Sequence, residues 1–301
     1  MNTYYLNDTP LAEFGFVPGH ASGSNIALSG AWDMPARTGE TYRKWAGEDG
    51  VEPYVRPDDD YLFGSREIQL VGNLVADSEE TLYEKIETFR AFLTGLPADA
   101  FLRCDWGQWN VSLRKEVKIV PRKTIAAVTL AFTEPAPALP DFSDATGPWP
   151  RQWILASGHW NSFGVWDDRE PWYCAPRIGA IDEWLWESFG LAIASTGGVW
   201  DLPARDELPA TLLSPGASWA PGGLGPHVLN LEGALSAADM EDFDRKIRSL
   251  TLLFGRPGLR KFRYRNCEYG IFAPEGFKIA SIQKRSRVYA KFTVKLIEAY
   301  E

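Results

Sequence analysis

Cysteines and long apolar runs are scarce in this sequence of 301 residues. The three cysteines, Cys104, Cys174 and Cys267, are odd in number and show no CxxC spacing. That usage argues against a disulfide framework or a zinc site, and it predicts buried thiols in a protein assembled in a reducing cytoplasm. No apolar run approaches the roughly 20 residues that cross a bilayer, so we expect no membrane anchor.

Motifs for catalysis or metal binding are also lacking. The three histidines, His20, His159 and His227, lie in turn-like contexts, and none is near a serine or cysteine in a recognisable elbow. A Ser/His/Asp centre can assemble in space, but nothing in the sequence selects one. The run Asp58-Asp59-Asp60 lacks the D-x-D-x-D-G spacing of a calcium loop and is interpreted as a solvated acidic loop. We therefore predict no enzymatic activity, no cofactor and no metal.

The formal net charge of -9 disfavours a general affinity for nucleic acid or anionic membranes, which requires a basic surface. One basic cluster, Arg260, Lys261, Arg263 and Arg265, has tyrosines interleaved as in some single-strand binders. Because alternate residues of a strand point to opposite faces, a solvated or subunit-facing side is the preferred interpretation.

The charge is unevenly distributed along the chain. Residues 1–134 hold 20 Asp and Glu against 13 Lys and Arg, a balance of -7, whereas residues 151–301 hold 18 of each. An acidic half joined to a neutral half predicts that the two halves face different surroundings.

What the sequence does contain is a repeat. Residues 66–97 and 227–257 match without a gap at a constant shift of 161, which places Gly72 on Gly233 and Lys85 on Lys246. WDMPAR at residues 32–37 also matches WDLPAR at residues 200–205 in five of six positions. We interpret the chain as a tandem duplication. The shared WDxPAR motif is expected to have a structural role in a strand end and turn.

Each copy has the pattern of strands followed by one helix. Leu82, Ile86, Phe89 and Leu93 recur at helical spacing and predict a helix over residues 78–94, capped by Asp77 or Ser78. The second copy predicts a helix over residues 237–254, with Ser236 and Asp239 at capping-box spacing. The predicted fold class is mainly β with one helix per domain, as two tandem β-sandwich-plus-helix domains.

The predicted domain organisation has four parts. These are a first domain at 1–134, a proline-rich linker at 135–152, a tryptophan-rich arm at 153–182 and a second domain at 183–301. The first domain contains a long polar loop at 38–65 that is rich in aromatic residues, which is unusual for a simple disordered segment. We expect the aromatic residues of this loop and of its counterpart to form a subunit interface. The candidate residues are Tyr42, Trp45, Tyr54, Tyr61 and Trp219.

The order of elements resembles the ring domain of phage distal tail proteins, the baseplate hub family of long-tailed siphophages. The residues that carry the resemblance are Phe14-Gly15-Phe16, the loop after residues 32–37, the strand run at 61–74 and the capped helix at 78–93 followed by paired strands. The resemblance covers residues 1–134 and extends to 183–301. In that family a different, often galectin-like, domain usually follows the ring domain, whereas here a second ring-like copy follows.

The resemblance implies a structural virion protein. It would form a ring at the distal end of the phage tail tube, as a trimer with pseudo-six-fold symmetry or as a hexamer. Its partners would be the tail tube and the tail-tip or hub proteins, with assembly in the bacterial host cytoplasm. An acidic channel wall, for which residues 1–134 are the better candidate, would let DNA pass without specific binding because like charges repel. The loop at 38–65 would pack on a neighbouring subunit or on the ring above.

A second interpretation comes from a different class of protein. The chain has 13 tryptophans, and sugar rings stack on flat aromatic faces, so a pair of carbohydrate-binding modules or a sugar-active enzyme is the alternative. Tryptophan is also enriched at the hot spots of protein interfaces, which favours the structural interpretation.

Overall fold

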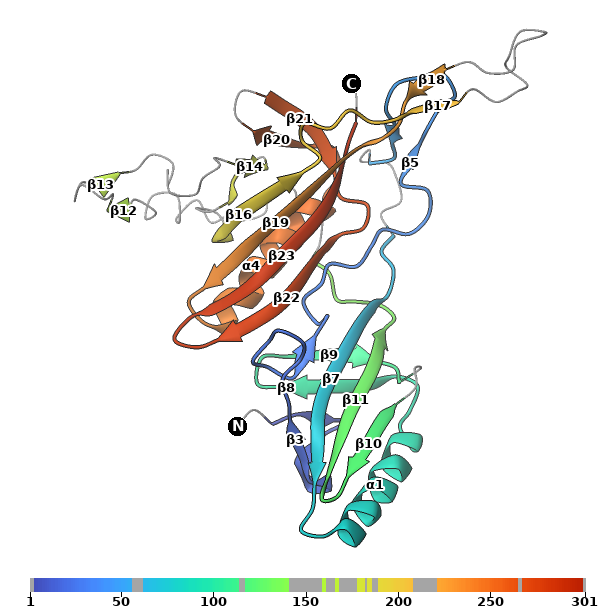
Figure 1. The fold of residues 1–301 in the computed structure, drawn as a ribbon, viewed down its shortest axis with the longest axis vertical. Helices are drawn as coiled ribbons and strands as arrows, with labels where there is room; N and C mark the ends of the chain where they lie inside the picture. The colour runs from blue at the N-terminus through green and yellow to red at the C-terminus, as the bar shows by residue number, and fades with distance from the viewer. Residues whose placement is uncertain are drawn as a thin grey trace, which may run out of the picture.

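The fold is mainly β, as the sequence predicts, with antiparallel sheets and the two helices α1 and α4 (Figure 1). The computed structural model describes residues 3–55, 62–113, 117–140, 159–160, 166–167, 178–181, 183–185, 189–207, 221–264 and 267–299. No helix in this described part of the chain is long and apolar enough to span a membrane.

The first unit, named here for the elements between Tyr5 and Glu134, contains two sheets and one helix. One sheet has the order β10 (Lys118–Arg122), β11 (Ile125–Glu134), β7 (Arg66–Val75) and β3 (Phe16–Pro18), with β4 (Leu28–Ser29) also paired to β7. The other has the order β2 (Thr9–Pro10), β1 (Tyr5–Leu6), β8 (Ala100–Cys104) and β9 (Gly107–Val111). The 3-10 helix η1 (Leu11–Phe14) precedes β3, and α1 (Glu79–Thr94) follows β7. An isolated bridge between Ser112 and Thr133 joins the two sheets.

The second unit is named for the elements from Ile178 to Glu298. Its main sheet has the order β15 (Glu183–Trp184), β14 (Ile178–Ile181), β20 (Arg260–Tyr264), β21 (Cys267–Phe272), β23 (Val288–Glu298), β19 (His227–Ala237) and β16 (Leu191–Gly197). The strand β22 (Phe277–Lys284) pairs with β23, and α4 (Met240–Gly255) follows β19. Because β14 belongs to this sheet, the sheet begins before residue 183, where the sequence analysis places the start of the second domain.

The strand registers of the two units correspond at the centre of their sheets. In the first unit Gly72 lies opposite Val128 of β11, and in the second unit Gly233 lies opposite Phe292 of β23. The edge strands follow the same rule, because Ile119 pairs with Val128 and Ile279 pairs with Phe292. Ile119 of β10 and Ile279 of β22 therefore occupy equivalent positions. The helices α1 and α4 each have 16 residues and begin at positions related by the same shift of 161.

The first helix follows the sequence prediction closely. Ser78 is its N-cap, and the Ser78 hydroxyl accepts a hydrogen bond from the Thr81 amide at 3.1 Å. The predicted apolar stripe of α1 is buried, so burial of one helical face against the sheet is what stabilises the helix.

The predicted start of the second helix needs a correction. Ser236 belongs to β19, and the N-cap is Asp239, whose carboxylate accepts from the Asp242 amide at 2.8 Å. The Asp242 carboxylate in turn accepts from the Ala238 amide at 2.8 Å. The reciprocal capping pattern is therefore present three residues later than expected, since pairing of β19 with β23 continues through Ala237.

Short hairpin-like pairs extend from both units. In the first unit β5 (Tyr42–Arg43) pairs with β6 (Glu52–Pro53), and in the second unit β17 (Arg205–Glu207) pairs with β18 (Pro221–Leu224). These two pairs, called here the first and second arms, lie together at one end of the molecule (Figure 1). Within the tryptophan-rich segment, β12 (His159–Trp160) pairs with β13 (Trp166–Asp167). Residues 141–152 of the proline-rich segment lie outside the described residues.

Candidate subunit interface

Both units contain the same arrangement, in which a glycine and a helix lysine bind one residue near the end of the strand that precedes the helix. Gly15 has φ 74°, and its carbonyl accepts from the Val75 amide at 3.0 Å, while Lys85 of α1 donates to the Val75 carbonyl at 2.8 Å. In the second unit Gly190 has φ 64°, and its carbonyl accepts from the Ser236 amide at 2.9 Å. Lys246 of α4 donates to the Ser236 carbonyl at 2.8 Å. The left-handed backbone favours glycine at both positions.

Gly72 and Gly233 lie at the centre of β7 and β19 because neighbouring strands approach them closely. A Cβ atom at Gly72 would lie 2.3 Å from the Phe16 ring, and one at Gly233 would lie 2.4 Å from the Ala192 carbonyl oxygen. These glycines occupy the same register position in the two sheets, as the sequence repeat predicts.

A pair of titratable side chains occupies the same end of both sheets. Arg66, which is half-buried, and the buried Glu134 form an ion pair at 2.5 Å in the first unit, and they are register partners on β7 and β11. In the second unit the register partners His227 and Glu298 are 2.5 Å apart. The Nε2 atom of His227 lies 2.7 Å from the Gly198 carbonyl. Both ring nitrogens of His227 therefore lie within hydrogen-bonding distance of oxygen atoms of the same unit.

The first WDxPAR segment, residues 32–37, lies between α4 and β22 of the second unit. The Trp32 ring packs edge-on against Phe243 of α4 at 5.7 Å, and only 3% of Trp32 is exposed. The Met34 amide donates to the Phe277 carbonyl at 3.0 Å, which adds this segment to the free edge of β22. A segment from one unit thus fills a site in the other.

Two charged residues fix this segment at its ends. The Asp33 carboxylate accepts from the Ile279 amide at 2.7 Å and lies 3.4 Å from the Lys278 ammonium. The Arg37 guanidinium donates to the Phe254 and Gly255 carbonyls at 3.1 and 3.2 Å, at the C-terminus of α4 where the helix dipole favours a cation.

Burial of Asp33 has an electrostatic consequence. Burial raises the pKa of the Asp33 carboxyl above its ordinary value, although the Ile279 amide and the Lys278 ammonium favour the charged form. The carboxylate is therefore held in place by specific partners at a desolvation cost.

The remainder of the β22 edge is covered by another segment of the first unit. The Ser24 hydroxyl accepts from the Ile282 amide at 2.9 Å. Asn25 donates to the Ile282 and Lys284 carbonyls and accepts from the Lys284 amide at 2.7 Å. The edge strand of the second unit is consequently satisfied along much of its length, which protects it from pairing with another chain.

The second WDxPAR segment, residues 200–205, has the opposite environment. Trp200 is 64% exposed and Leu202 is 80% exposed, the highest fraction among the exposed large apolar residues of the described chain. Asp201 is exposed as well. The Trp200 ring touches Tyr264 of its own unit at 5.6 Å. The turn that presents the segment is the same in both units, because Asp33 and Asp201 amides donate to the Gly30 and Gly198 carbonyls at 3.2 and 2.9 Å.

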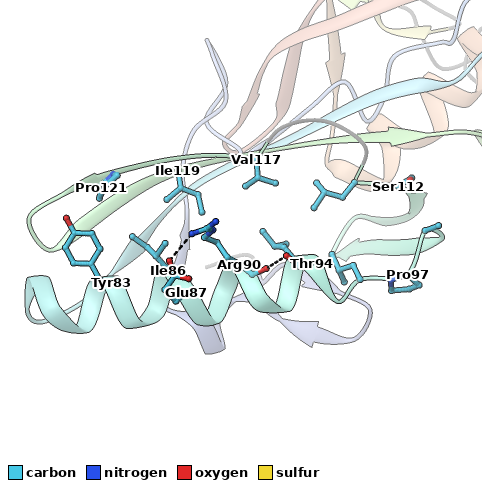
Figure 2. A pocket seen from close by; sticks show the side chains of 14 residues that line it. Tyr83, Ile86, Glu87, Arg90, Thr94, Pro97, Ser112, Val117, Ile119 and Pro121 are labelled. Atoms are coloured by element: carbon cyan, nitrogen blue, oxygen red, sulfur yellow. Dashed lines mark hydrogen bonds and ion pairs between the residues drawn. The ribbon is translucent and has the colours of Figure 1, made fainter.

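The first unit also has an open groove where the second unit holds the first WDxPAR segment. This α1–β10 groove has a volume of about 890 Å³. Figure 2 shows Ile86 and Arg90 of α1 and Val117 and Ile119 on the opposite wall facing the space between them. Tyr83, which lines the groove near the start of the helix, is 50% exposed. Leu93 and Thr94 line its other end.

The aromatic residues predicted as an interface occupy different surroundings. Tyr42 is half-buried, and its ring packs against Phe272 of the second unit at 6.1 Å. Trp45 is 41% exposed, with the Arg43 guanidinium 4.1 Å from its ring centre. Tyr54 is half-buried, and its amide donates to the Thr41 carbonyl at 2.9 Å. The remaining two predicted residues, Tyr61 and Trp219, lie outside the described residues.

The two arms bind each other within the chain. The Gly50 amide donates to the Leu224 carbonyl at 2.9 Å, and the Leu224 amide donates to the Asp49 carboxylate at 2.7 Å. Lys44 lies 3.3 Å from Asp206. The loop at 38–55 thus packs on the second unit of its own chain, a contact that no pattern in the sequence predicts.

The Cys104 thiol and the described members of the predicted basic cluster are buried or form ion pairs. Cys104 is buried and free, and burial raises the pKa of its thiol to about 11. Lys261 and Arg263 of the predicted basic cluster both pair with Glu268 at 3.0 Å, whereas Arg260 is buried. Among the described residues no group of three or more His, Cys, Asp or Glu could hold a metal ion.

Comparisons with known proteins give a distant structural likeness. No family model matches the sequence, and no curated protein matches it. The chain is similar to the crystal structure of the SPP1 Dit protein, described as a paradigm of the hub adsorption apparatus in phages that infect Gram-positive hosts. The match has 16% identity and a TM-score of 0.35, and it covers 44% of this chain and 49% of that chain. The chain thus matches about half the length of that structure, a likeness too distant to identify a function.

Proposed function

We propose that this protein is a structural, non-enzymatic subunit of a phage tail that forms a ring at the distal end of the tail tube and connects it to the tail tip. The observation that carries the proposal is the contact between the two units. A loop of the first unit occupies a site between the helix and the edge strand of the second. A head-to-tail contact between related units generates a ring when the rotation closes.

The proposal includes a tandem duplication, in which the two units are copies of one ring-forming domain. It is supported by the shared strand registers, the two 16-residue helices, the Gly15 and Gly190 arrangements and the paired titratable side chains at the ends of the sheets. Two such copies in each chain favour a trimer with pseudo-six-fold symmetry. A hexamer in which only one unit lines the channel is the other arrangement.

The charge distribution agrees with a channel-lining role for the first unit. Residues 1–134 have a balance of -7, and residues 151–301 have a balance of zero. An acidic wall would repel the DNA phosphates, so DNA would pass without specific binding. The tail tube and the tail-tip or hub proteins are the proposed partners, and the virion is the proposed location.

The paired arms are the proposed contact with a neighbouring subunit or ring. They lie together at one end of the molecule, and Trp45 remains 41% exposed on the first arm (Figure 1). The candidate interface residues Tyr42, Trp45 and Tyr54 belong to the first arm or lie next to it in the sequence, whereas Tyr61 and Trp219 lie outside the described residues. Tyr42 also packs on Phe272 of the same chain, so a substitution of Trp45 tests this contact more directly.

Native mass measurement and negative-stain imaging of the purified chain test the proposal. We expect particles with a central opening and a mass of three or six copies of 33.7 kDa. A mass of three copies would favour the pseudo-six-fold arrangement. A chain that remains monomeric at micromolar concentration would contradict the proposed function.

A further inference from the structure

The α1–β10 groove of the first unit is equivalent in position to the site that the first WDxPAR segment fills in the second unit. Register pairing makes Ile119 equivalent to Ile279 and Lys118 equivalent to Lys278. The shift of 161 along the helices makes Leu93 and Thr94 equivalent to Phe254 and Gly255, whose carbonyls bind Arg37. The strand-edge and helix-end contacts of the first WDxPAR segment therefore have candidate counterparts at the open groove, whereas Leu82, the equivalent of Phe243, is buried and does not line it.

The segment that would fit this groove is the second WDxPAR segment. It differs from the first only in having Leu202 where the first has Met34. The corresponding turns place both segments immediately after the strand that pairs with β7 or β19. In the isolated chain, however, Trp200 and Leu202 are 64% and 80% exposed. These two exposed side chains give the segment an apolar surface that a second chain can cover.

The charged and hydrogen-bonding groups of the second WDxPAR segment also match those at the groove. Asp33 binds the Ile279 amide and the Lys278 ammonium in the occupied site. Asp201 is exposed on the second segment, and Lys118 is exposed on β10 next to Ile119, which lines the groove. Asp201 can therefore make the same two contacts with the Ile119 amide and the Lys118 ammonium. Pro121 has no amide hydrogen, so pairing along this edge of β10 is limited to the residues before it.

We propose that the second WDxPAR segment of one chain docks in the α1–β10 groove of a second copy of the same chain. Leu202 lies against Val117, Asp201 binds Lys118 and the Ile119 amide, and Trp200 covers the part of the groove near Tyr83. This inference rests on the proposed function and deepens it, because it names the surfaces that close the ring. The contact between chains repeats the contact that already exists between the two units of one chain, as pseudo-six-fold symmetry requires.

The first experiment blocks each surface separately. Leu202→Glu places a charge on the docking segment. Val117→Glu with Lys118→Glu places one carboxylate in the groove and replaces the lysine at the edge of β10 whose equivalent, Lys278, contacts Asp33. Tyr289→Ala on β23 is the matched control, because it removes a 46% exposed aromatic side chain that belongs to neither surface. Each blocked variant is expected to need a roughly 30-fold higher concentration to assemble, the effect of losing one interface hot spot. The Tyr289→Ala chain should assemble through this contact as the wild type does.

The two blocked variants, when mixed, give a sharper readout. The groove of the Leu202→Glu chain and the docking segment of the Val117→Glu/Lys118→Glu chain both remain intact. We therefore expect a one-to-one heterodimer of twice 33.7 kDa that does not grow into a ring. Neither variant alone should dimerise under the same conditions, and far-ultraviolet circular dichroism of each should match that of the wild type.

Cysteine cross-linking tests the register of the contact. The docked arrangement brings Leu202→Cys of one chain next to Val117→Cys of another, as the Met34 amide lies 3.0 Å from the Phe277 carbonyl within one chain. Oxidation of the double variant should give cross-linked species of two and three chains on a non-reducing gel. Leu202→Cys combined with Val120→Cys is the control, because residue 120 points to the opposite face of β10 from residues 119 and 121. The single-cysteine variants report any background from the native thiols.

The outcomes separate this inference from the proposed function. Rings that form normally from both blocked variants would overturn the docking contact while leaving the ring-forming function in place. Cross-linking at residue 120 as efficiently as at residue 117 would also overturn it. A wild-type chain that stays monomeric contradicts the proposed function and the docking contact together.

Discussion

The two WDxPAR segments have nearly the same sequence and opposite environments. Trp32 is 3% exposed and Trp200 is 64% exposed, although each follows the same turn at the end of an equivalent strand. The difference lies in what each segment meets, because α4 and β22 cover the first segment and no described element covers Trp200 and Leu202 to the same extent. Local sequence sets the shape of the segment, and the presence of a partner sets its burial.

The two helices also differ in the ion pairs that their side chains form. Asp242 of α4 is buried with Lys246 at 3.0 Å and Arg245 at 2.6 Å, whereas the equivalent position in α1 is Thr81. Lys85 is half-buried and Lys246 is buried, yet both donate to a strand carbonyl at 2.8 Å. The common hydrogen bond belongs to the shared scaffold, and the ion pairs are specific to the second unit.

The largest expected effect comes from truncating the two matched tryptophans. Trp32→Ala removes a buried ring between the units and should lower the free energy of unfolding by about 3 to 5 kcal/mol. Trp200→Ala in the monomeric chain should change it by less than about 1 kcal/mol, because the ring is mostly exposed. Urea denaturation followed by fluorescence measures both. Equal losses would show that the two segments do not differ in burial in solution.

The matched lysines should give the next largest difference. Lys246→Met leaves the buried Asp242 carboxylate without one of its two cationic partners and should cost about 3 kcal/mol. Lys85→Met removes only the hydrogen bond to the Val75 carbonyl, which should cost about 1 kcal/mol. Thermal and urea unfolding of both variants provide the comparison. A larger loss for Lys85→Met would contradict the assigned difference between the helices.

The two close-approach glycines should behave alike and so test what the units share. A Cβ atom at either Gly72 or Gly233 would lie less than 3.0 Å from a neighbouring strand. Gly72→Ala and Gly233→Ala should each cost about 2 kcal/mol through overpacking. Gly197→Ala is a suitable control, since its nearest contact would be 3.7 Å away. If one of the two substitutions left the free energy of unfolding nearly unchanged, the two sheets would not be equivalent at this position.

The smallest expected effect depends on pH and is confined to the second unit. Burial by itself raises the pKa of Asp242, but the Ala238 amide and the Arg245 and Lys246 side chains outweigh burial and lower the pKa below its ordinary 3.8. The carboxylate therefore contributes stability above about pH 3.8, and this contribution is lost as the pH falls through the lower folded-state pKa.

Asp242→Asn should accordingly cost about 1 to 2 kcal/mol at pH 7, with the difference from the wild type shrinking below about pH 4. Unfolding curves between pH 7 and pH 2.5 measure this trend. Asp244→Asn is the control, because its pair with Arg248 is largely exposed and should contribute less than about 0.5 kcal/mol. A gap between Asp242→Asn and the wild type that stays constant down to pH 2.5 would contradict the lowered pKa.

A sequence pattern predicts an element correctly when residues at a short, regular spacing stabilise that element. The stripe of Leu82, Ile86, Phe89 and Leu93 predicts α1 because only one helical face packs on the sheet. The glycine register at Gly72 and Gly233 predicts equivalent strands. The sequence places the start of α4 too early because Ser236 can cap a helix locally, and only strand pairing through Ala237 shows that the strand continues past it.

The sequence by itself determined the mainly β fold, the two helices and the repeated WDxPAR motif, since alternation, helical stripes and turns act over a few residues. Only the tertiary structure decided which copy of the motif is buried. Burial depends on contacts between residues far apart in the chain, such as Trp32 with Phe243 and Asp33 with Ile279. The same long-range pairing decided that the loop at 38–55 packs on the second unit and that the α1–β10 groove stays open, because neither outcome follows from a local pattern.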